Sequence, residues 1–272
     1  MSKTRPLIIA HRGASGCAPE NTLAAFQLAA PMGSDGVEMD VNLSADGRPV
    51  VIHDHRLNRT TNSAGLVSLL SAGELAALNA GGGFKARMSL KRKRTANAAA
   101  FSSFHRGVPS LDEVLALLAR FTLSRIYVEL KGTPLTRMPL LEATLQAIER
   151  SGLEKSITLL SFDHELMAEA AKIQPSIRTA LTFHLVKGAI PATRAIAKAV
   201  DRARASEAAL HHALATRRRI AALHKRGMAV SAWTANGRLT MKRLIESGVD
   251  CIMTNYPHRL RDLIESQPAS DR

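Results

Sequence analysis

The amino-acid sequence predicts an α/β fold, a TIM-type (β/α)8 barrel with a small insertion after its second strand. Short apolar runs alternate with segments of helical periodicity along nearly the whole chain. The length of 272 residues suits one such barrel, and no Pro/Ser-rich linker divides it, so residues 1–272 are expected to form a single domain. Polar groups follow several of the apolar runs, the position that active-site residues occupy at the C-terminal ends of barrel strands.

Strands are expected at residues 7–10, 37–43, 50–53 and 126–130 in the N-terminal half, and at 157–161, 178–183, 228–234 and 249–254 in the C-terminal half. Asp46-Gly47 is a hairpin-type turn signal between the second and third of these strands. An antiparallel insertion is therefore expected to begin there.

Helical periodicity predicts helices between the strands. Asn21 or Thr22 can cap the first helix, in which the apolar residues Leu23, Phe26 and Ala30 recur at helical spacing. Further helices are expected at residues 110–120, 139–150, 164–173, 213–225 and 239–246, with a last one from His258.

The segment 187–212 is basic and lacks a clear apolar strand for the sixth barrel position. Residues 208–210 are the best candidate for that strand. The sequence leaves helix and strand unseparated in the rest of this segment.

The charge of the chain is strongly basic. Lys and Arg number 37 against 23 Asp and Glu, a net charge of +14, which would suit a polyanion or an anionic membrane surface. Much of the excess lies in residues 85–94 and 217–219, and such runs are more often solvated faces. No apolar segment is long enough for a signal peptide or a membrane span, so a cytoplasmic protein is expected.

Three carboxylates form a candidate metal site. Glu38 and Asp40 are two residues apart, so on a strand both point to the same side, and Glu129 near the end of another strand could complete the cluster. Oxygen-only ligation selects a hard ion, Mg²⁺ or Ca²⁺. The alternative is that Glu38 and Asp40 form the polar face of a half-exposed strand.

Candidate groups for acid/base chemistry and for substrate binding follow other strands. His11 and His53 each close a predicted strand, and a histidine near neutral pKa can donate or accept a proton. Arg12 and Lys131 can bind phosphate oxygens, with ordinary solvation as the alternative. Trp233 ends a strand, where its ring could cover part of a ligand or a cationic head group, or could simply pack in the core or at the rim.

Together these groups resemble the glycerophosphodiester phosphodiesterases, in the order of that family's motifs and over nearly the whole chain. The motifs are His11-Arg12-Gly13, Pro19-Glu20-Asn21-Thr22, Gly36-Val37-Glu38-Met39-Asp40-Val41, His53-Asp54, Arg59-Thr60-Thr61, Pro109-Ser110-Leu111-Asp112-Glu113-Val114, Glu129-Leu130-Lys131, Ser161-Phe162-Asp163, Trp233-Thr234-Ala235-Asn236 and Gly248-Val249-Asp250. The resemblance implies a TIM barrel whose insertion, at about residues 54–109, overhangs the substrate site. It also implies that Glu38, Asp40 and Glu129 are metal ligands. By the same motifs, His11 and His53 would be the acid/base pair, and Arg12 and Lys131 would contact the phosphate.

The activity implied by this resemblance is metal-dependent hydrolysis of glycerophosphodiesters, such as glycerophosphocholine or glycerophosphoethanolamine, to sn-glycerol 3-phosphate and an alcohol. The nucleophile is either water or the substrate's vicinal hydroxyl, and either histidine could be the acid. The unusual basic stretch at 85–106 leaves the substrate preference open. Hydrolysis of lysophospholipids, as by a lysophospholipase D, and a non-catalytic polyanion-binding barrel are the alternatives. We expect no specific nucleic-acid partner and at most a weak association with anionic membranes, and the oligomeric state stays open.

Overall fold

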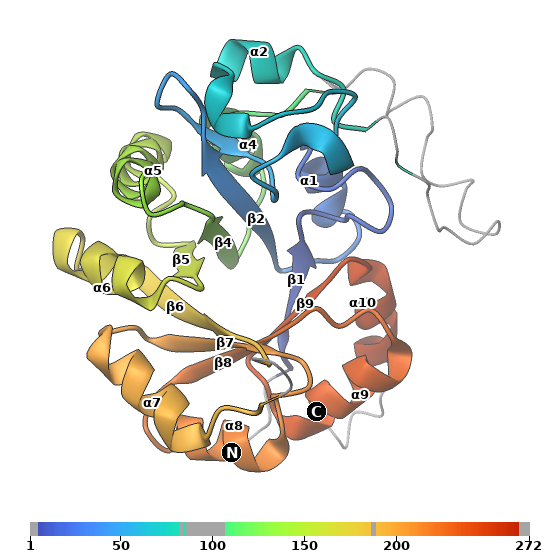
Figure 1. The fold of residues 1–272 in the computed structure, drawn as a ribbon. Coiled ribbons are helices and arrows are strands. Elements are labelled where there is room, and N and C mark those ends of the chain that lie inside the picture. Colours follow the sequence, from blue (N-terminus) through green and yellow to red (C-terminus); the bar gives the residue numbers. More distant parts are fainter. Residues whose placement is uncertain (1–4, 82–83, 85–106, 186–188, 267–272) are drawn as a thin grey trace.

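The structure, a computed structural model, describes residues 5–81, 84, 107–185 and 189–266. Within them, nine strands form one sheet, and all of them except β3 are parallel and close into a barrel (Figure 1). The barrel closes because β1 pairs with both β2 and β9. The barrel strands are β1 (Leu7–His11), β2 (Gly36–Leu43), β4 (Arg125–Leu130), β5 (Ile157–Ser161), β6 (Arg178–Phe183), β7 (Glu207–His211), β8 (Ala229–Trp233) and β9 (Cys251–Thr254). The predicted TIM barrel is confirmed.

The helices surround this barrel in chain order (Figure 1). They are α1 (Leu23–Ala29), α4 (Leu111–Leu118), α5 (Arg137–Ser151), α6 (His164–Ile173), α7 (Thr193–Arg202), α8 (Arg217–His224), α9 (Arg238–Ser247) and α10 (Pro257–Glu265). Thr22 caps α1, and Ser110 caps α4 through a reciprocal bond with Glu113, while Gly152 ends α5 in the left-handed conformation. Among the described residues, no helix combines the length and hydrophobicity that crossing a bilayer requires.

An insertion separates β2 from the next barrel strand, β4. It contains β3 (Pro49–Val51), which pairs antiparallel with β2, then η1 (Leu57–Arg59), η2 (Val67–Leu69) and α2 (Ala72–Ala76). A small apolar core of its own, which includes Leu57, Val67 and Leu75, holds the insertion together. The predicted strand at 50–53 is too long, because β3 ends at Val51 and His53 lies beyond it. The basic stretch at 85–106 lies outside the described residues.

The sixth strand of the barrel is β7, which pairs with β6 and β8 and contains the predicted residues 208–210. Its signal is weak because it is short and contains two alanines, which have low β propensity. Its first residue, Glu207, lies buried inside the barrel and accepts a hydrogen bond of 2.8 Å from the Tyr127 hydroxyl. The preceding residues form α7, which the sequence left unassigned.

The alternation of side chains along β2 separates two layers of the molecule. Val37, Met39 and Val41 point outward into the main apolar core between the barrel and its helices. Glu38 and Asp40, the residues between them, therefore point into the barrel. Because all of these side chains are buried, β2 is a fully covered strand and not the half-exposed strand that the sequence left open.

The charges in the first turns of the helices differ around the barrel. Helices α4 and α6 begin with acidic residues, which the positive end of the helix dipole favours. Helices α7, α8 and α9 have no acidic residue there and begin instead with Arg194, Arg217, Arg218 and Arg238. A cation at this end costs roughly 0.3–1 kcal/mol at an exposed site. Helix stability therefore does not explain these arginines.

The pairing of β2 with β4 depends on the absence of a side chain at Gly36. A Cβ atom there would lie 2.1 Å from the carbonyl oxygen of Arg125, on the neighbouring strand. We expect Gly36→Ala to lower the free energy of unfolding by about 3 kcal/mol, as overpacking does in cores, measured by urea denaturation. Gly73→Ala, in α2 where a Cβ meets nothing within 4 Å, is the matched control and should be neutral or stabilising. Equal stability of the two variants would contradict this account.

Candidate active site

Three buried carboxylates meet at the C-terminal end of β2 and β4. In the β2–β4 register, Asp40 lies opposite Glu129, and Glu38 is two residues before Asp40 on the same face. Their side chains offer oxygen atoms that all lie within 4.8 Å of one another. Glu38 and Asp40 are 1% exposed and Glu129 is 8% exposed. The structure thus brings together the carboxylates that the sequence singled out.

The three carboxyl groups perturb one another's protonation. Burial, followed by the neighbouring Asp40 and Glu129, raises the pKa of Glu38 well above its usual value. Burial also raises the pKa of Glu129 to about 7, although Lys131 opposes the change. Burial disfavours ionisation of Asp40 too, but Lys131 and Arg12 outweigh it and hold the pKa of Asp40 well below its usual range. The cluster carries more buried negative charge than its neighbours neutralise.

These residues fit a hard divalent cation. All three offer oxygen ligands, the kind that Mg²⁺ and Ca²⁺ prefer. Glu38 Oε1 is buried with no hydrogen-bond partner among the described residues, and an ion between the carboxylates would satisfy it. The Lys131 ammonium contacts Asp40 Oδ1 at 3.1 Å and also contacts Glu129. The Lys131 ammonium thus offsets part of the negative charge of the carboxylates, and a bound ion would offset the rest.

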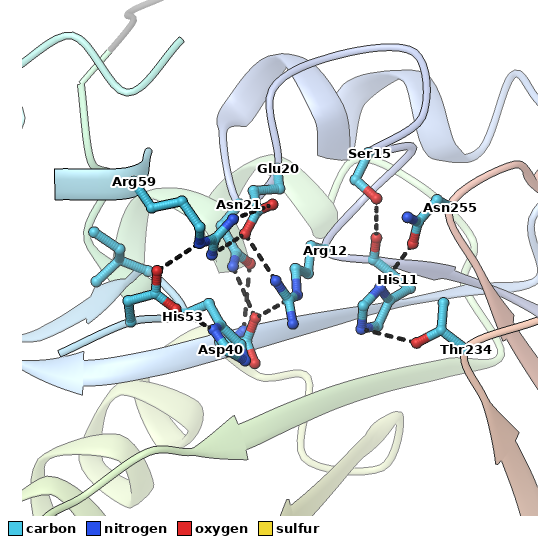
Figure 2. Close-up of polar contacts among 12 residues, drawn as sticks. His11, Arg12, Ser15, Glu20, Asn21, Asp40, His53, Arg59, Thr234 and Asn255 are labelled. Carbon is cyan, nitrogen blue, oxygen red and sulfur yellow. Dashed lines mark hydrogen bonds and ion pairs between the residues drawn. The ribbon is translucent and has the colours of Figure 1, made fainter. Parts of the chain in front are cut away.

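His11 lies at the end of β1, beside Glu38 in the β1–β2 register. Its Nδ1 lies 2.8 Å from the amide oxygen of Asn255, so the proton is on Nδ1 (Figure 2). Its Nε2 then carries the lone pair, 3.8 Å from Glu38 Oε2 and 3.5 Å from the Thr234 hydroxyl. Burial and the adjacent Arg12 lower the pKa of His11 to about 4. At neutral pH this imidazole is uncharged and can accept a proton.

His53 comes from the insertion and has a charged partner. Its Nδ1 lies 2.6 Å from Asp54 Oδ1, and Arg59 donates through Nε to Asp54 Oδ2 at 2.5 Å (Figure 2). Burial lowers the pKa of His53, while Asp40 and Asp54 act in the opposite direction. The partner of the His53 ring is thus an anionic carboxylate, whereas the partner of the His11 ring is an uncharged amide.

A chain of alternating charges connects the barrel to the insertion. Arg12 Nε lies 3.1 Å from Asp40 Oδ2, and Arg12 donates at 2.8 Å to Glu20. Arg59 donates to both carboxylate oxygens of Glu20, at 2.8 and 2.9 Å (Figure 2). Arg12 has a φ of 56°, and so does Asn21, whose amide donates to Asp40. Backbone strain at both residues indicates that the surrounding contacts hold them in place.

Trp233 lies at the rim of this site, next to Thr234. Its indole N–H donates to the Ala209 carbonyl at 3.1 Å, and its ring meets Phe162 edge-on at 5.6 Å. The Lys131 ammonium stands 5.7 Å from the centre of the Phe162 ring. The single tryptophan is therefore half-buried and fixed by packing, and its role toward a substrate stays a prediction.

The structure places His11, Arg12, Glu38, Asp40, Glu129 and Lys131 in direct contact with one another, and His53 joins them through the insertion. Sequence reasoning assigned no role to the residues that hold the histidines and Arg59 in place. These are Glu20, Asp54, Thr234 and Asn255. Glu20, Asp54 and Thr234 lie within the recognised motifs, and Asn255 directly follows the last strand, a position that could have revealed it.

Comparisons with known proteins agree with this geometry. The model of the glycerophosphoryl diester phosphodiesterase family matches residues 11–259. The Bacillus subtilis protein YhdW is 34% identical over 255 residues, which cover 92% of this chain and 94% of that protein. A glycerophosphodiester phosphodiesterase of Bacillus altitudinis is 32% identical, over 93% of this chain and 95% of its own.

A solved structure of similar fold is an Oleispira antarctica phosphodiesterase in complex with the product sn-glycerol-3-phosphate. It has a TM-score of 0.82 and 26% sequence identity, and it covers 96% of this chain and 98% of the other. The glycerophosphodiester phosphodiesterase of Agrobacterium tumefaciens has a TM-score of 0.75 at 28% identity, over 94% and 99% of the two chains. Both likenesses extend over the barrel and its insertion.

The raised pKa values of Glu38 and Glu129 predict how an ion should stabilise the fold. Both groups keep their protons to a higher pH than an ordinary carboxyl group, and an ion must displace those protons, so ion binding should strengthen as the pH rises through about 7, the pKa of Glu129. We expect Mg²⁺ or Ca²⁺ at roughly 100 times its Kd to raise Tm more at pH 8 than at pH 6. Differential scanning fluorimetry measures this, with Glu38→Gln as the control. An equal shift at both pH values would contradict the assignment.

Proposed function

The chain belongs to the glycerophosphoryl diester phosphodiesterase family, and from this premise we propose that it hydrolyses glycerophosphodiesters to sn-glycerol 3-phosphate and an alcohol. Glycerophosphocholine and glycerophosphoethanolamine are the substrates we propose to test. The observation that carries the proposal is the buried group of three carboxylates flanked by His11 and Lys131, with His53 opposite. The product named in the Oleispira antarctica complex supports the same reaction.

We propose that Glu38, Asp40 and Glu129 hold Mg²⁺ or Ca²⁺ during the reaction. Such an ion supplies Lewis-acid stabilisation of the charge on the phosphate oxygens. The acidic residues around it are themselves anchored, since Asn21 and Arg12 bind Asp40, and the Arg12 backbone N–H donates to Glu38 Oε2 at 2.9 Å. A preformed set of ligands lowers the cost of binding the ion.

The two histidines have different partners, and this supports a division of their roles. His11 has a neutral amide partner at Nδ1 and a lone pair on Nε2, so we assign it as the base that takes the proton of the nucleophile. His53 has the Asp54 carboxylate, which favours the imidazolium, so we assign it as the acid that protonates the leaving alcohol. Arg12 and Lys131 lie beside the carboxylates and would add positive charge toward the phosphate.

The nucleophile is either water or the vicinal hydroxyl of the glycerol unit. The second route breaks the diester in two steps and passes through a cyclic glycerol phosphate, which the same base and acid would then open with water. Rapid-quench samples analysed by phosphorus NMR distinguish the routes. A cyclic phosphate that forms and decays at the rate of turnover supports the internal hydroxyl, and its absence supports water.

The central experiment measures sn-glycerol 3-phosphate released from glycerophosphocholine with Mg²⁺, with Ca²⁺ and with chelator. We expect metal-dependent release that falls by about 10²–10⁴-fold in His11→Ala and His53→Ala, the range typical of general acid–base catalysis. Glu38→Ala should abolish the metal dependence. His224→Ala is the control, because His224 binds Asp250 on the exposed surface away from this site. Release from a long-chain lysophospholipid but not from glycerophosphocholine would replace the substrate proposed here, and no release from either would refute it.

Replacing Asp54 should move the pH profile in a defined direction. The Asp54 carboxylate raises the pKa of His53, so Asp54→Asn should lower that pKa and the acid should lose its proton at a lower pH. We expect the alkaline limb of kcat/KM to move to lower pH by about one unit. Asp112→Asn, which removes a carboxylate paired with Arg150 outside the site, should leave the profile unchanged. An unchanged limb in Asp54→Asn would refute the assignment of His53 as the acid.

A further inference from the structure

We propose that the protein docks onto an anionic phospholipid bilayer through a basic and apolar surface beside the mouth of its barrel. We call this surface the arginine rim, and it consists of Ile190, Arg194, Arg217, Arg218, Arg238 and Leu239. The inference concerns where the enzyme acts and goes beyond the hydrolysis proposed above.

The arginine rim lies on the same face of the barrel as the candidate active site. Helices α7, α8 and α9 follow the C-terminal ends of β6, β7 and β8, so their first turns stand at the end of the barrel where the carboxylates lie. The three helices are neighbours around the barrel (Figure 1). A partner that covers these first turns would therefore lie next to the substrate entrance.

Two further arginines join the first turns into one surface. Arg219 is buried and donates from α8 to the carbonyl of Pro191 at 2.8 Å and to the Thr193 hydroxyl at 3.2 Å, at the start of α7. Arg243 of α9 donates to the carbonyls of His212 and Ala215 at 2.6 and 2.8 Å, in the loop before α8. The run 217–219, expected to be a solvated face, thus has one structural member and two exposed ones.

The exposed arginines of the rim have no internal role in the structure. Arg194, Arg217, Arg218 and Arg238 form no ion pair with any described residue, whereas Arg137, Arg150 and Arg226 are each paired with a carboxylate. Each stands in the first turn of its helix, where the backbone dipole disfavours a cation. Four cations in unfavourable positions on one surface indicate an external anionic partner.

Apolar side chains identify the partner as a bilayer. Ile190 is 65% exposed and Leu239 is 84% exposed, and both lie among the arginines. On the same face, in the loop after β4, Leu135 is 90% exposed. Aliphatic side chains between cations can enter the boundary between head groups and acyl chains, while arginines bind the anionic head groups. A nucleic acid would use the arginines but would leave the exposed aliphatic groups in water.

The test measures co-sedimentation of the full chain with vesicles of 70% phosphatidylcholine and 30% phosphatidylglycerol, and with pure phosphatidylcholine vesicles. A rim variant combines Arg194→Gln, Arg217→Gln, Arg218→Gln and Arg238→Gln. Since each cation near an anionic surface contributes roughly fivefold to binding, the variant should bind anionic vesicles at least about 100-fold more weakly. Its hydrolysis of soluble glycerophosphocholine should equal that of the wild type, which separates this proposal from the proposed function.

The matched control removes the same charge from the opposite end of the barrel, with Lys155→Gln, Arg202→Gln, Arg204→Gln and Lys225→Gln, all exposed. It should bind vesicles as the wild type does, within about threefold. The basic stretch at 85–106 is present in both variants and does not affect the comparison. Equal loss in both variants, full binding by the rim variant, or no preference of the wild type for anionic vesicles would overturn the proposal.

A second variant, Ile190→Ser with Leu239→Ser, tests the bilayer against a nucleic acid. It should reduce binding to anionic vesicles by about tenfold or more, because the variant loses two aliphatic groups that would be buried in the bilayer. Unchanged vesicle binding by this variant, together with tight binding of the wild type to a DNA duplex of about 20 base pairs, would replace the bilayer by a nucleic acid as the proposed partner.

Discussion

The burial of three carboxylates at the end of the barrel is the constraint on which the rest of the site depends. Like charges taken out of water repel one another strongly, and they persist only where cations or hydrogen-bond donors offset the charge. Arg12, Lys131 and Asn21 supply this compensation within the protein. Burial raises the pKa of Glu38 and Glu129 because this compensation is incomplete, and a divalent cation between the carboxylates would complete it.

The cations that offset this charge also connect the two parts of the molecule. Arg12 follows β1, while Arg59 ends η1 in the insertion, and both bind Glu20. Arg59 in turn orders Asp54, which orders His53. Charge balance in the barrel is thus coupled to the position of an imidazole that comes from outside it. Such a chain explains how an insertion with a small core of its own can present a side chain in a defined orientation.

Two groups of cations near the mouth of the barrel have different physical roles. Inside the barrel mouth, arginine and lysine are buried and paired with carboxylates, so they contribute little to the net charge of +14. On the outer rim, Arg194, Arg217, Arg218 and Arg238 are exposed and form no ion pair among the described residues. The amino-acid composition gives only the total charge of both groups of cations. The exposed population is the one available to an anionic partner, because burial and pairing already satisfy the other.

The sequence by itself determined the barrel, most of its elements and the carboxylates of the candidate metal site, because strand periodicity and the alternation through Glu38, Met39 and Asp40 depend only on neighbours in the chain. It could not decide that β2 is covered on both faces, that β3 ends before His53, or that Arg219 is structural while Arg217 and Arg218 are exposed. The partners Asn255 and Asp54 and the pKa shifts also required the tertiary structure. Burial, register and charge balance arise between segments far apart in the chain, and only the closed barrel brings those segments within a few ångströms of one another.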